Sequence, residues 1–317
     1  TYSIGGLIQA TDYNGFADTT VGANVNATWG TGATSAGYGQ TAISTVAAAG
    51  TVTATQWSTL VNTISSMASH QGTTITARTA PVAGNTISIL SAVNTDITNC
   101  YNNRGNAVAN GTQFTGWTGT NSKTAATSGA TWTITFTNTV TFASADAARY
   151  FFNAGGRIKI DVSKTSTGNT GDPEWNDLAN TLCGDIFITG GDYSQTIAGV
   201  VYTGTTKSGG TGTPNTLATT TGWFDLTGTP TIVYKQFADT APYTSNFIQH
   251  SLSATATVLT ITTLWSASDG DPITGGTAAS GATPGTAPCT IVTYFPPSTT
   301  YLTTASWGTP SVAATTT

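Results

Sequence analysis

Residues 246–265 read NFIQHSLSATATVLTITTLW, and this stretch decides the fold class. It divides into two candidate strands, Asn246–Ser253 and Thr255–Trp265, in which apolar and polar residues alternate with a period of two. Such alternation is typical of strands that bury one face and expose the other. Because one strand follows the other with no long helix between them, the pattern favours antiparallel sheets over a parallel α/β sheet.

The same pattern extends in both directions from this stretch. Apolar residues alternate with polar ones over 132–136 and 158–162. Further candidate strands are Asp185–Thr189, Thr196–Thr203, Gly222–Leu226, Thr231–Phe237, Cys289–Phe295 and Ser298–Ser306. Gly, Asp and Pro clusters separate them, and long polar loops are expected at 204–216 and 267–288. We therefore predict a mainly β protein whose residues 126–317 form a Thr/Gly-rich antiparallel β-sandwich domain.

Two short helices are expected within this sandwich. Ser144 is a suitable N-cap for a helix over 145–152, which Gly155 and Gly156 would close. Asp172-Pro173 is a helix start, with Asp at the N-cap and Pro at the first helical position. Trp175, Leu178 and Leu182 would form the apolar face of that second helix, which Gly184 would end.

The N-terminal region, residues 1–125, has a different pattern. Residues 1–50 are small and Gly-rich, which predicts an extended arm with aromatic anchors, a disordered terminus being the alternative. Thr53 and Gln56 match a capping box, and the helix that they begin would end at Gly72. A second helix over 88–102 would complete a helical hairpin. The polar stretch 106–130 is interpreted as a linker or an ordered loop.

The first of these helices carries a strong apolar stripe. Little other apolar material is evident in the N-terminal region to cover it, so we predict that the stripe is an oligomerisation surface. Its members recur at helical spacing: Trp57, Leu60, Val61, Ile64 and Met67.

The composition excludes several classes of function. Only 7% of residues are charged, against about 25% in an average domain, and Thr and Gly are used heavily instead. A net charge of −5 gives no attraction to nucleic acid, and no apolar run is long enough to span a membrane. The N-terminus lacks the features of a signal peptide, although a leader could have been removed. Such compositions are typical of proteins that work outside cells, including virion components and adhesins.

Catalytic residues are scarce, and we expect no enzymatic activity, no cofactor and no metal site. The chain has one Glu and two His, and it contains none of the common hydrolase or nucleotide-binding motifs. His70 is expected at a helix C-terminus, where the dipole favours an imidazolium, and His250 on a strand surface. Asp172, Glu174 and Asp177 are explained by the start of a helix. Asp269-Gly270-Asp271 reads as a turn, with a Ca²⁺ site as the alternative.

The three cysteines, Cys100, Cys183 and Cys289, have no zinc-binding spacing. Buried, reduced thiols are one interpretation. A disulfide from one of them to another subunit, formed in an oxidising medium, is the second. An intrachain pair with the third thiol buried is the remaining alternative.

Several segments together resemble virion structural proteins of tailed bacteriophages, particularly those of marine and cyanobacterial myoviruses. They are LIQATDYNGF at 7–16, the GYGQ…VTATQW module within 37–73, RYFFNAGG within 140–160, a β-module at 243–272, and ASWGTPSV at 305–312. Their order matches as well. The chain departs from that family in its three cysteines and in a less acidic DGD loop, which leaves any metal role open.

The resemblance implies a structural component of the tail, neck or collar, baseplate or fibre. We expect a homo-oligomer, for example a trimer, that docks on other virion proteins, assembles in the host cytoplasm and is carried in the extracellular particle. The alternative is a receptor- or glycan-binding adhesin, in which Trp117, Trp223 and Trp265 stack on sugars of the host surface. For these Trp residues, core packing is the competing interpretation. A secreted hydrolase is the third hypothesis.

Overall fold

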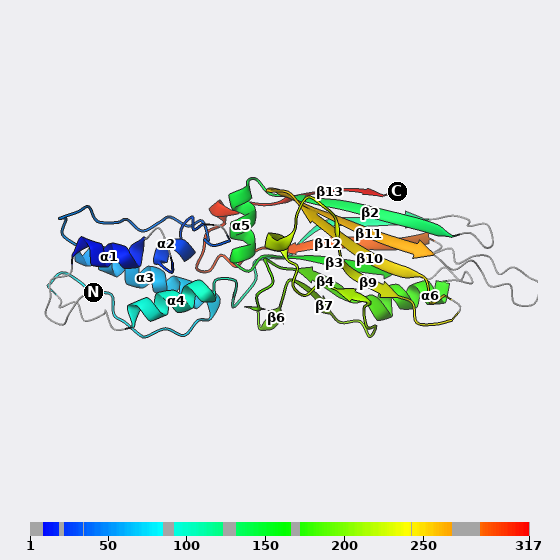
Figure 1. Ribbon diagram of the computed structural model, residues 1–317, viewed down its shortest axis with the longest axis horizontal. Coiled ribbons are helices and arrows are strands. Elements are labelled where there is room, and N and C mark those ends of the chain that lie inside the picture. The colour runs from blue at the N-terminus through cyan, green and yellow to red at the C-terminus, as the bar shows by residue number, and fades with distance from the viewer. Residues whose placement is uncertain are drawn as a thin grey trace, which may run out of the picture.

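The structure, a computed structural model, is elongated, with helices at one end and strands at the other (Figure 1). It describes residues 9–18, 22–33, 35–84, 92–122, 131–165, 172–241, 243–267 and 286–316. The prediction of a mainly β protein, with an N-terminal helical part followed by antiparallel sheets, is confirmed.

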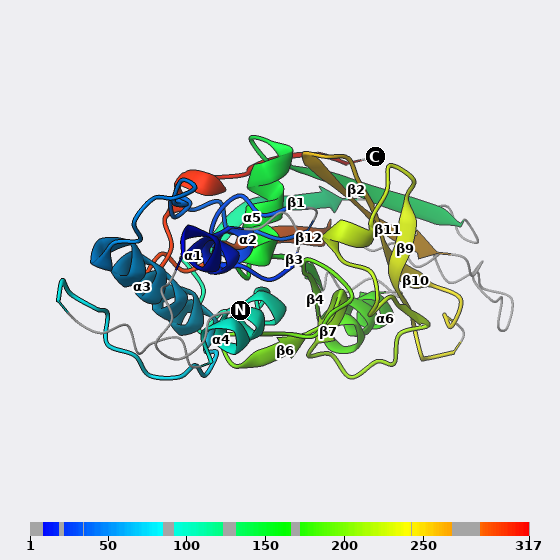
Figure 2. The same cartoon turned by 60° about the vertical axis from the view of Figure 1, so that its left-hand side comes forward.

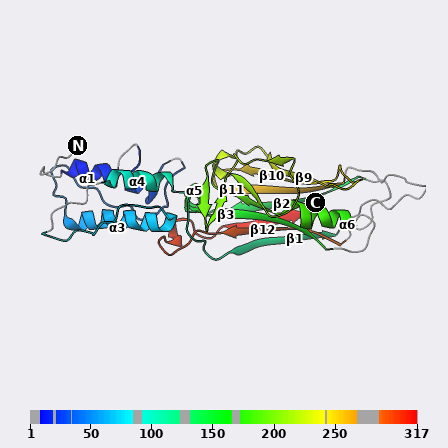
Figure 3. The same ribbon diagram turned by 90° about the horizontal axis from the view of Figure 1, so that it is seen from below.

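Two antiparallel sheets form the sandwich. The five-stranded sheet has the order β1-β12-β3-β4-β7, and the six-stranded sheet the order β13-β2-β11-β10-β9-β8. Figure 3 shows the layer that contains β1, β12 and β3 lying against the layer that contains β9, β10 and β11. The strands are β1 (Phe114–Ser122), β2 (Trp132–Thr141), β3 (Arg157–Lys164), β4 (Asp185–Ile188), β7 (Thr205–Ser208), β8 (Thr216–Leu217), β9 (Thr231–Phe237), β10 (Phe247–Ala254), β11 (Val258–Ala267), β12 (Thr286–Phe295) and β13 (Ser311–Thr316).

The stretch 246–265 forms the centre of the larger sheet. β10 and β11 pair directly, with Ile248 opposite Trp265 and Leu252 opposite Ile261. All four of these side chains are buried, because the period-two pattern directs them to the same face. β2 and β9 then pair with the outer sides of this hairpin. The pattern that predicted the fold class therefore forms the core of the sandwich.

Aromatic side chains close the sandwich at both ends. Trp175 lies on α6 (Asp172–Asp177), where its ring centroid is 4.8 Å from that of Trp132 and 5.7 Å from that of Trp265. At the other end, Phe152 of α5 (Ala145–Asn153) stacks on Trp223 at 5.2 Å. The two short inserted helices thus supply the rings that cover the open ends of the two sheets.

The N-terminal part consists of α1 (Ala10–Ala17), α2 (Val25–Thr28), α3 (Ala54–Gln71) and α4 (Val93–Asn102). The predicted capping box is present: Gln56 N donates to Thr53 Oγ1 at 3.3 Å, and Thr53 N donates to Gln56 Oε1 at 2.8 Å. Gly72 ends α3 in the left-handed conformation, as predicted. The arm therefore contains two short helices in addition to its extended segments.

Asparagine side chains fasten the extended part of the arm. The Asn26 side chain donates to Ile43 O and accepts from Ile43 N, both at 2.9 Å. Asn14 makes the same pair of bonds with Val46, both at 2.8 Å. Each amide group therefore replaces the strand partner that this segment lacks and satisfies its backbone groups.

Several expected elements differ from the structure. The segment predicted as one strand over 196–203 is a hairpin of β5 (Gln195–Ile197) and β6 (Val200–Tyr202), because Ala198 and Gly199 both adopt positive φ. The strand predicted over 222–226 is absent, and these residues contain a 3-10 helix, Trp223–Asp225. The strand predicted over 298–306 is absent as well, and this segment contains a second 3-10 helix, Thr304–Ser306. β1 lies in the expected linker, β7 and β8 lie in the expected loop 204–216, and β13 was not predicted. The second helix begins at Val93.

Candidate structural site: the junction of the helices and the sandwich

α5 connects the two parts of the molecule. It stands between the helical part and the strands (Figure 2). Ser144 caps it as predicted, with Ala147 N donating to Ser144 Oγ at 3.0 Å. Phe151 and Phe152 are fully buried against the sandwich. The polar residues of the same helix reach the N-terminal arm, so α5 contacts both parts.

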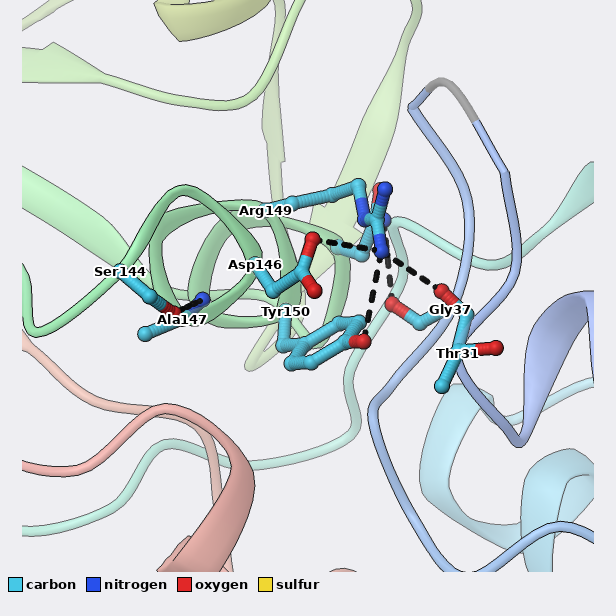
Figure 4. Close-up of polar contacts among 8 residues, drawn as sticks. Thr31, Gly37, Ser144, Asp146, Ala147, Arg149 and Tyr150 are labelled. Carbon is cyan, nitrogen blue, oxygen red and sulfur yellow. Dashed lines mark hydrogen bonds and ion pairs between the residues drawn. The ribbon is translucent and has the colours of Figure 1, made fainter. Parts of the chain in front are cut away.

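Figure 4 shows how α5 binds the arm. Arg149 Nη2 donates to Thr31 O at 2.8 Å, and the same nitrogen lies 3.0 Å from Asp146 Oδ1. Asn153 Nδ2 donates to Gly37 O at 3.1 Å. Thr31 and Gly37 belong to a turn of the arm, and the two α5 side chains bind its backbone carbonyls. The contact therefore depends on the shape of that turn.

The arm also binds the C-terminal segment at this place. Thr303 N donates to Gln40 Oε1 at 2.9 Å, and Gln40 Nε2 donates to Ser306 Oγ at 3.1 Å. Gly39 lies between the Tyr150 ring and Ser306, in a space that has no room for a Cβ. The GYGQ, RYFFNAGG and ASWGTPSV segments, which are far apart in the sequence, therefore meet at one junction.

A buried polar network underlies the junction. Gln71 Nε2 donates to Tyr38 Oη at 2.7 Å and to Cys100 O at 3.0 Å, and Tyr38 Oη donates to Arg104 O at 2.7 Å. Burial raises the pKa of Tyr38 above its ordinary value, so its hydroxyl remains protonated and can donate. These bonds connect α3, α4 and the arm.

His70 belongs to this network, which corrects the prediction of an imidazolium at a helix terminus. The side chain is 1% exposed, its Nε2 lies 3.0 Å from Ala154 O, and its ring packs edge-on against Tyr38. Burial lowers the pKa of His70 to about 4, although the hydrogen bond to Ala154 acts in the opposite direction. The folded state therefore holds a neutral imidazole whose Nε2–H donates to Ala154 O.

His250 is also buried, which corrects its expected place on a strand surface. Its Nδ1 lies 3.0 Å from Thr263 Oγ1, and its ring stacks on Tyr234 with centroids 5.3 Å apart. Burial lowers the pKa of His250 to about 3. The register places His250 on the same face as Ile248 and Leu252, which point into the core.

We predict that the two histidines make the protein less stable in acid. The unfolded chain takes up these protons near pH 6.5, whereas folded His70 does so only near pH 4. Stability therefore falls as the pH drops through this window, by about 3 kcal/mol for His70 alone. Urea unfolding at a series of pH values between 7 and 4 measures the slope. His70→Gln, which can still donate to Ala154 O, should show a shallower slope, and equal slopes would contradict the prediction.

The predicted oligomerisation stripe on α3 does not lie on the surface of the chain. Its five members, Trp57, Leu60, Val61, Ile64 and Met67, are between 0% and 7% exposed within the single chain. Trp57 packs against Tyr13 at 5.4 Å and Phe16 at 6.2 Å between ring centroids. α1 covers this part of the stripe, because the arm contains a helix with apolar residues of its own. The stripe is therefore covered within the single chain, and its use as an assembly surface stays a prediction.

The three cysteines are buried and free within the chain, as the interpretation as buried thiols expects, and they form no intrachain pair in this structure. Burial raises the pKa of Cys100 and of Cys183 to about 12, and it also raises the pKa of Cys289. Neither a surface position nor a reactive thiolate is present at these three residues to support the alternative of a disulfide between subunits.

We predict that the folded protein resists thiol reagents. An aromatic disulfide reagent should label none of the three cysteines within minutes at pH 8, and all three once guanidinium chloride unfolds the chain. On a non-reducing gel the protein should run at the monomer position. A dimer band that disappears with reductant would contradict this prediction.

The remaining candidates are the acidic residues near the start of α6 and the turn predicted at 269–271. Glu174 is buried, and desolvation, followed by the nearby Asp177 and Asp239 carboxylates, raises its pKa to about 7. Among the described residues, no three His, Cys, Asp or Glu side chains are placed to hold a metal ion. The side chain of Asp172 and the Asp269–Asp271 turn lie outside the described residues.

Two of the three tryptophans considered for sugar stacking lie in the core. Trp223 is 7% exposed and Trp265 is fully buried. The side chain of Trp117 is outside the described part of the structure. In that part, no helix combines the length and the apolar character needed to span a membrane.

Comparison of the chain with protein-family models, with curated proteins and with solved structures finds no match. The class of the protein is therefore described here by its fold alone. It is a mainly β, two-part protein in which α5 fastens a helical N-terminal part to an antiparallel sandwich.

Proposed function

We propose that this protein is a non-enzymatic structural component of a tailed phage particle, in the tail, neck or collar, baseplate or a fibre. It forms a homo-oligomer and docks on other virion proteins. The observation that carries the proposal is the junction. Three of the segments on which the resemblance to phage virion proteins rests meet there: the GYGQ segment of the arm binds the RYFFNAGG segment of α5 and the ASWGTPSV segment.

The core supports a role as a rigid connector. One continuous cluster of buried apolar side chains runs from Tyr13 and Trp57 in the helical part to Phe151 and Trp265 in the sandwich. Domains that move independently have separate cores joined by a linker. Here a change in the angle between the two parts would open the shared core. A component that holds neighbouring virion proteins at fixed positions needs such a fixed angle between its two parts.

The β5–β6 hairpin offers a surface for self-association in place of the α3 stripe. Val200 and Val201 are successive strand residues and point to opposite faces, yet they are 48% and 59% exposed. The hairpin tip therefore projects from the body with apolar side chains on both faces. A contact that covered both valines would remove their apolar surface from water.

We predict that replacing both valines weakens self-association without weakening the fold. The Val200→Lys/Val201→Lys double variant should shift the oligomer towards monomer in light scattering after size exclusion, with an unchanged thermal midpoint. Ile232→Lys, at another exposed apolar position, serves as the matched control and should keep the wild-type mass. Wild-type protein that is monomeric at every concentration tested would contradict the prediction.

Gradient-purified particles of the phage that encodes the chain test the proposed function. Quantitative mass spectrometry should find the chain in these particles in a constant ratio to the major capsid protein. Its presence in the lysate but not in the particles would overturn the proposal.

A further inference from the structure

Arg157 carries a buried positive charge that has no partner in its own chain. It begins β3, and its side chain is 3% exposed on the face of the five-stranded sheet opposite to Ile158, which points into the shared core. Its Nε and Nη1 atoms are buried without a hydrogen-bond partner, and no carboxylate of the described residues lies within ion-pair distance of the guanidinium. A buried charge without a counter-charge is costly to the fold. The proposed connector role gives no reason for this cost.

Three aromatic rings hold the guanidinium of Arg157 in place. Its central carbon lies 4.7 Å from the ring centroid of Tyr202, 5.0 Å from that of Phe295 and 5.8 Å from that of Phe187. Such cation–π contacts offset part of the desolvation cost. They do not replace a carboxylate, because the N–H groups of a guanidinium donate in its own plane. The cage therefore fixes a cation whose hydrogen-bonding capacity is unused.

The Nη2 atom of Arg157 opens to the surface at the foot of the β5–β6 hairpin. Unlike Nε and Nη1, it is not enclosed by protein, and it donates no hydrogen bond to a described residue. Tyr202, whose ring covers the guanidinium, directly follows the exposed Val200 and Val201 in β6. A carboxylate that reaches Nη2 would meet a donor that the cage has already oriented, which lowers the entropic cost of binding.

Asp192 supplies an unpaired carboxylate beside the same hairpin. It is exposed, lies just before β5, and forms no hydrogen bond or ion pair with a described residue. Gly204 N donates to Gly191 O at 2.8 Å, which holds Asp192 close to the end of β6. The hairpin therefore has a cation and an anion next to its two exposed valines, each without a partner among the described residues. Where two copies meet through their hairpins about a symmetry axis, each copy presents the group that the other lacks.

We propose that Arg157 binds the Asp192 carboxylate of a second copy of this chain where two β5–β6 hairpins meet. The proposal rests on the proposed function, which puts the self-association surface on this hairpin. Nη2 donates to an oxygen of Asp192, and Val200 and Val201 of both copies exclude water around the pair, which strengthens it. The buried cation then has a use, because the single chain keeps an uncompensated charge that the assembled protein pairs.

Sedimentation velocity of the full chain over a concentration series tests this pair. Arg157→Met and Asp192→Asn should each weaken self-association about tenfold, which corresponds to about 1.4 kcal/mol. The double variant should associate no more weakly than either single variant, because both changes remove the same contact. Asp239→Asn, which neutralises an exposed carboxylate beside α6, is the matched control and should associate as wild type. At a concentration where the chain is monomeric, Arg157→Met should keep or raise the thermal midpoint, because it removes an unpaired buried charge.

Three results would overturn the proposal. They are wild-type self-association of folded Asp192→Asn, losses that add in the double variant, and a wild-type chain that is monomeric at every concentration. Asp192→Asn changes an exposed residue, so it decides the question even if Arg157→Met does not fold. If the Val200→Lys/Val201→Lys variant dissociates while Asp192→Asn does not, the hairpin contact of the proposed function stands and only the ion pair fails. Absence of the chain from purified particles would instead overturn the proposed function, whatever the two charge variants show.

Discussion

Gly39→Ala is expected to destabilise the protein by about 2–5 kcal/mol and to loosen the junction. Gly39 has a φ of +66°, which is unfavourable for any residue with a Cβ. The new methyl group would overlap the Tyr150 ring and would lie 2.6 Å from Ser306 Cβ. Because all three segments meet at this point, the methyl group must displace either α5 or the C-terminal segment. Urea unfolding measures the loss, and hydrogen exchange of residues 31–40 reports the loosening.

Gly308→Ala is the matched control for this variant. Gly308 has nearly the same φ, +63°, but nothing lies within 4 Å of the Cβ that it would gain. It should therefore show only the conformational cost, about 1 kcal/mol. Equal losses in the two variants would mean that Gly39 is needed for its backbone angle alone, and that the close approach to α5 has no energetic importance.

Trp57→Ala is expected to cost about 3–5 kcal/mol of folding free energy. The indole is fully buried between α3 and α1, against Tyr13 and Phe16, and its removal leaves a cavity that these rings cannot fill. The loss should appear first in the helical part, as faster proteolysis of residues 9–18. Self-association of the molecules that remain folded should not change, because Trp57 does not reach the surface.

Tyr301→Ala removes another aromatic ring from a position that is 42% exposed, and it should change stability by less than about 0.5 kcal/mol. If Trp57→Ala dissociates the oligomer while its thermal midpoint stays at the wild-type value, the α3 stripe is an assembly surface after all. The packing of α1 over the α3 stripe would then be incorrect.

The β-sandwich was predictable because buried apolar residues recur with a period of two in its central strands. Ile248 and Leu252 of β10 and Ile261 and Trp265 of β11 lie on the buried face, and a one-residue slip would turn them out of the core. β1 and β13 lack this signal. They are edge strands rich in Thr, Gly and Ala, and each pairs with a neighbouring strand of its sheet on one side. Local sequence does not reveal such a partner.

The residues of the junction could be predicted only in part. Capping at Ser144 and the left-handed end at Gly72 are local features, and both were found from the sequence. The bonds of Gln40 to Thr303 and Ser306 join residues more than 260 positions apart, which no local pattern can reveal. The α3 stripe illustrates the same limit. Its residues were identified correctly, but the helix that covers them lies in a stretch with a weak helical signal.

An electron cryo-microscopy map of the intact phage particle tests the central claim most directly. The account predicts an elongated density in several symmetry-related copies, in which the helical part and the sandwich keep the relative orientation of Figure 1. The shared core and the α5 junction should fit as one rigid body. A particle map in which every density is assigned to other proteins, or in which the two parts are hinged at α5, would contradict the account.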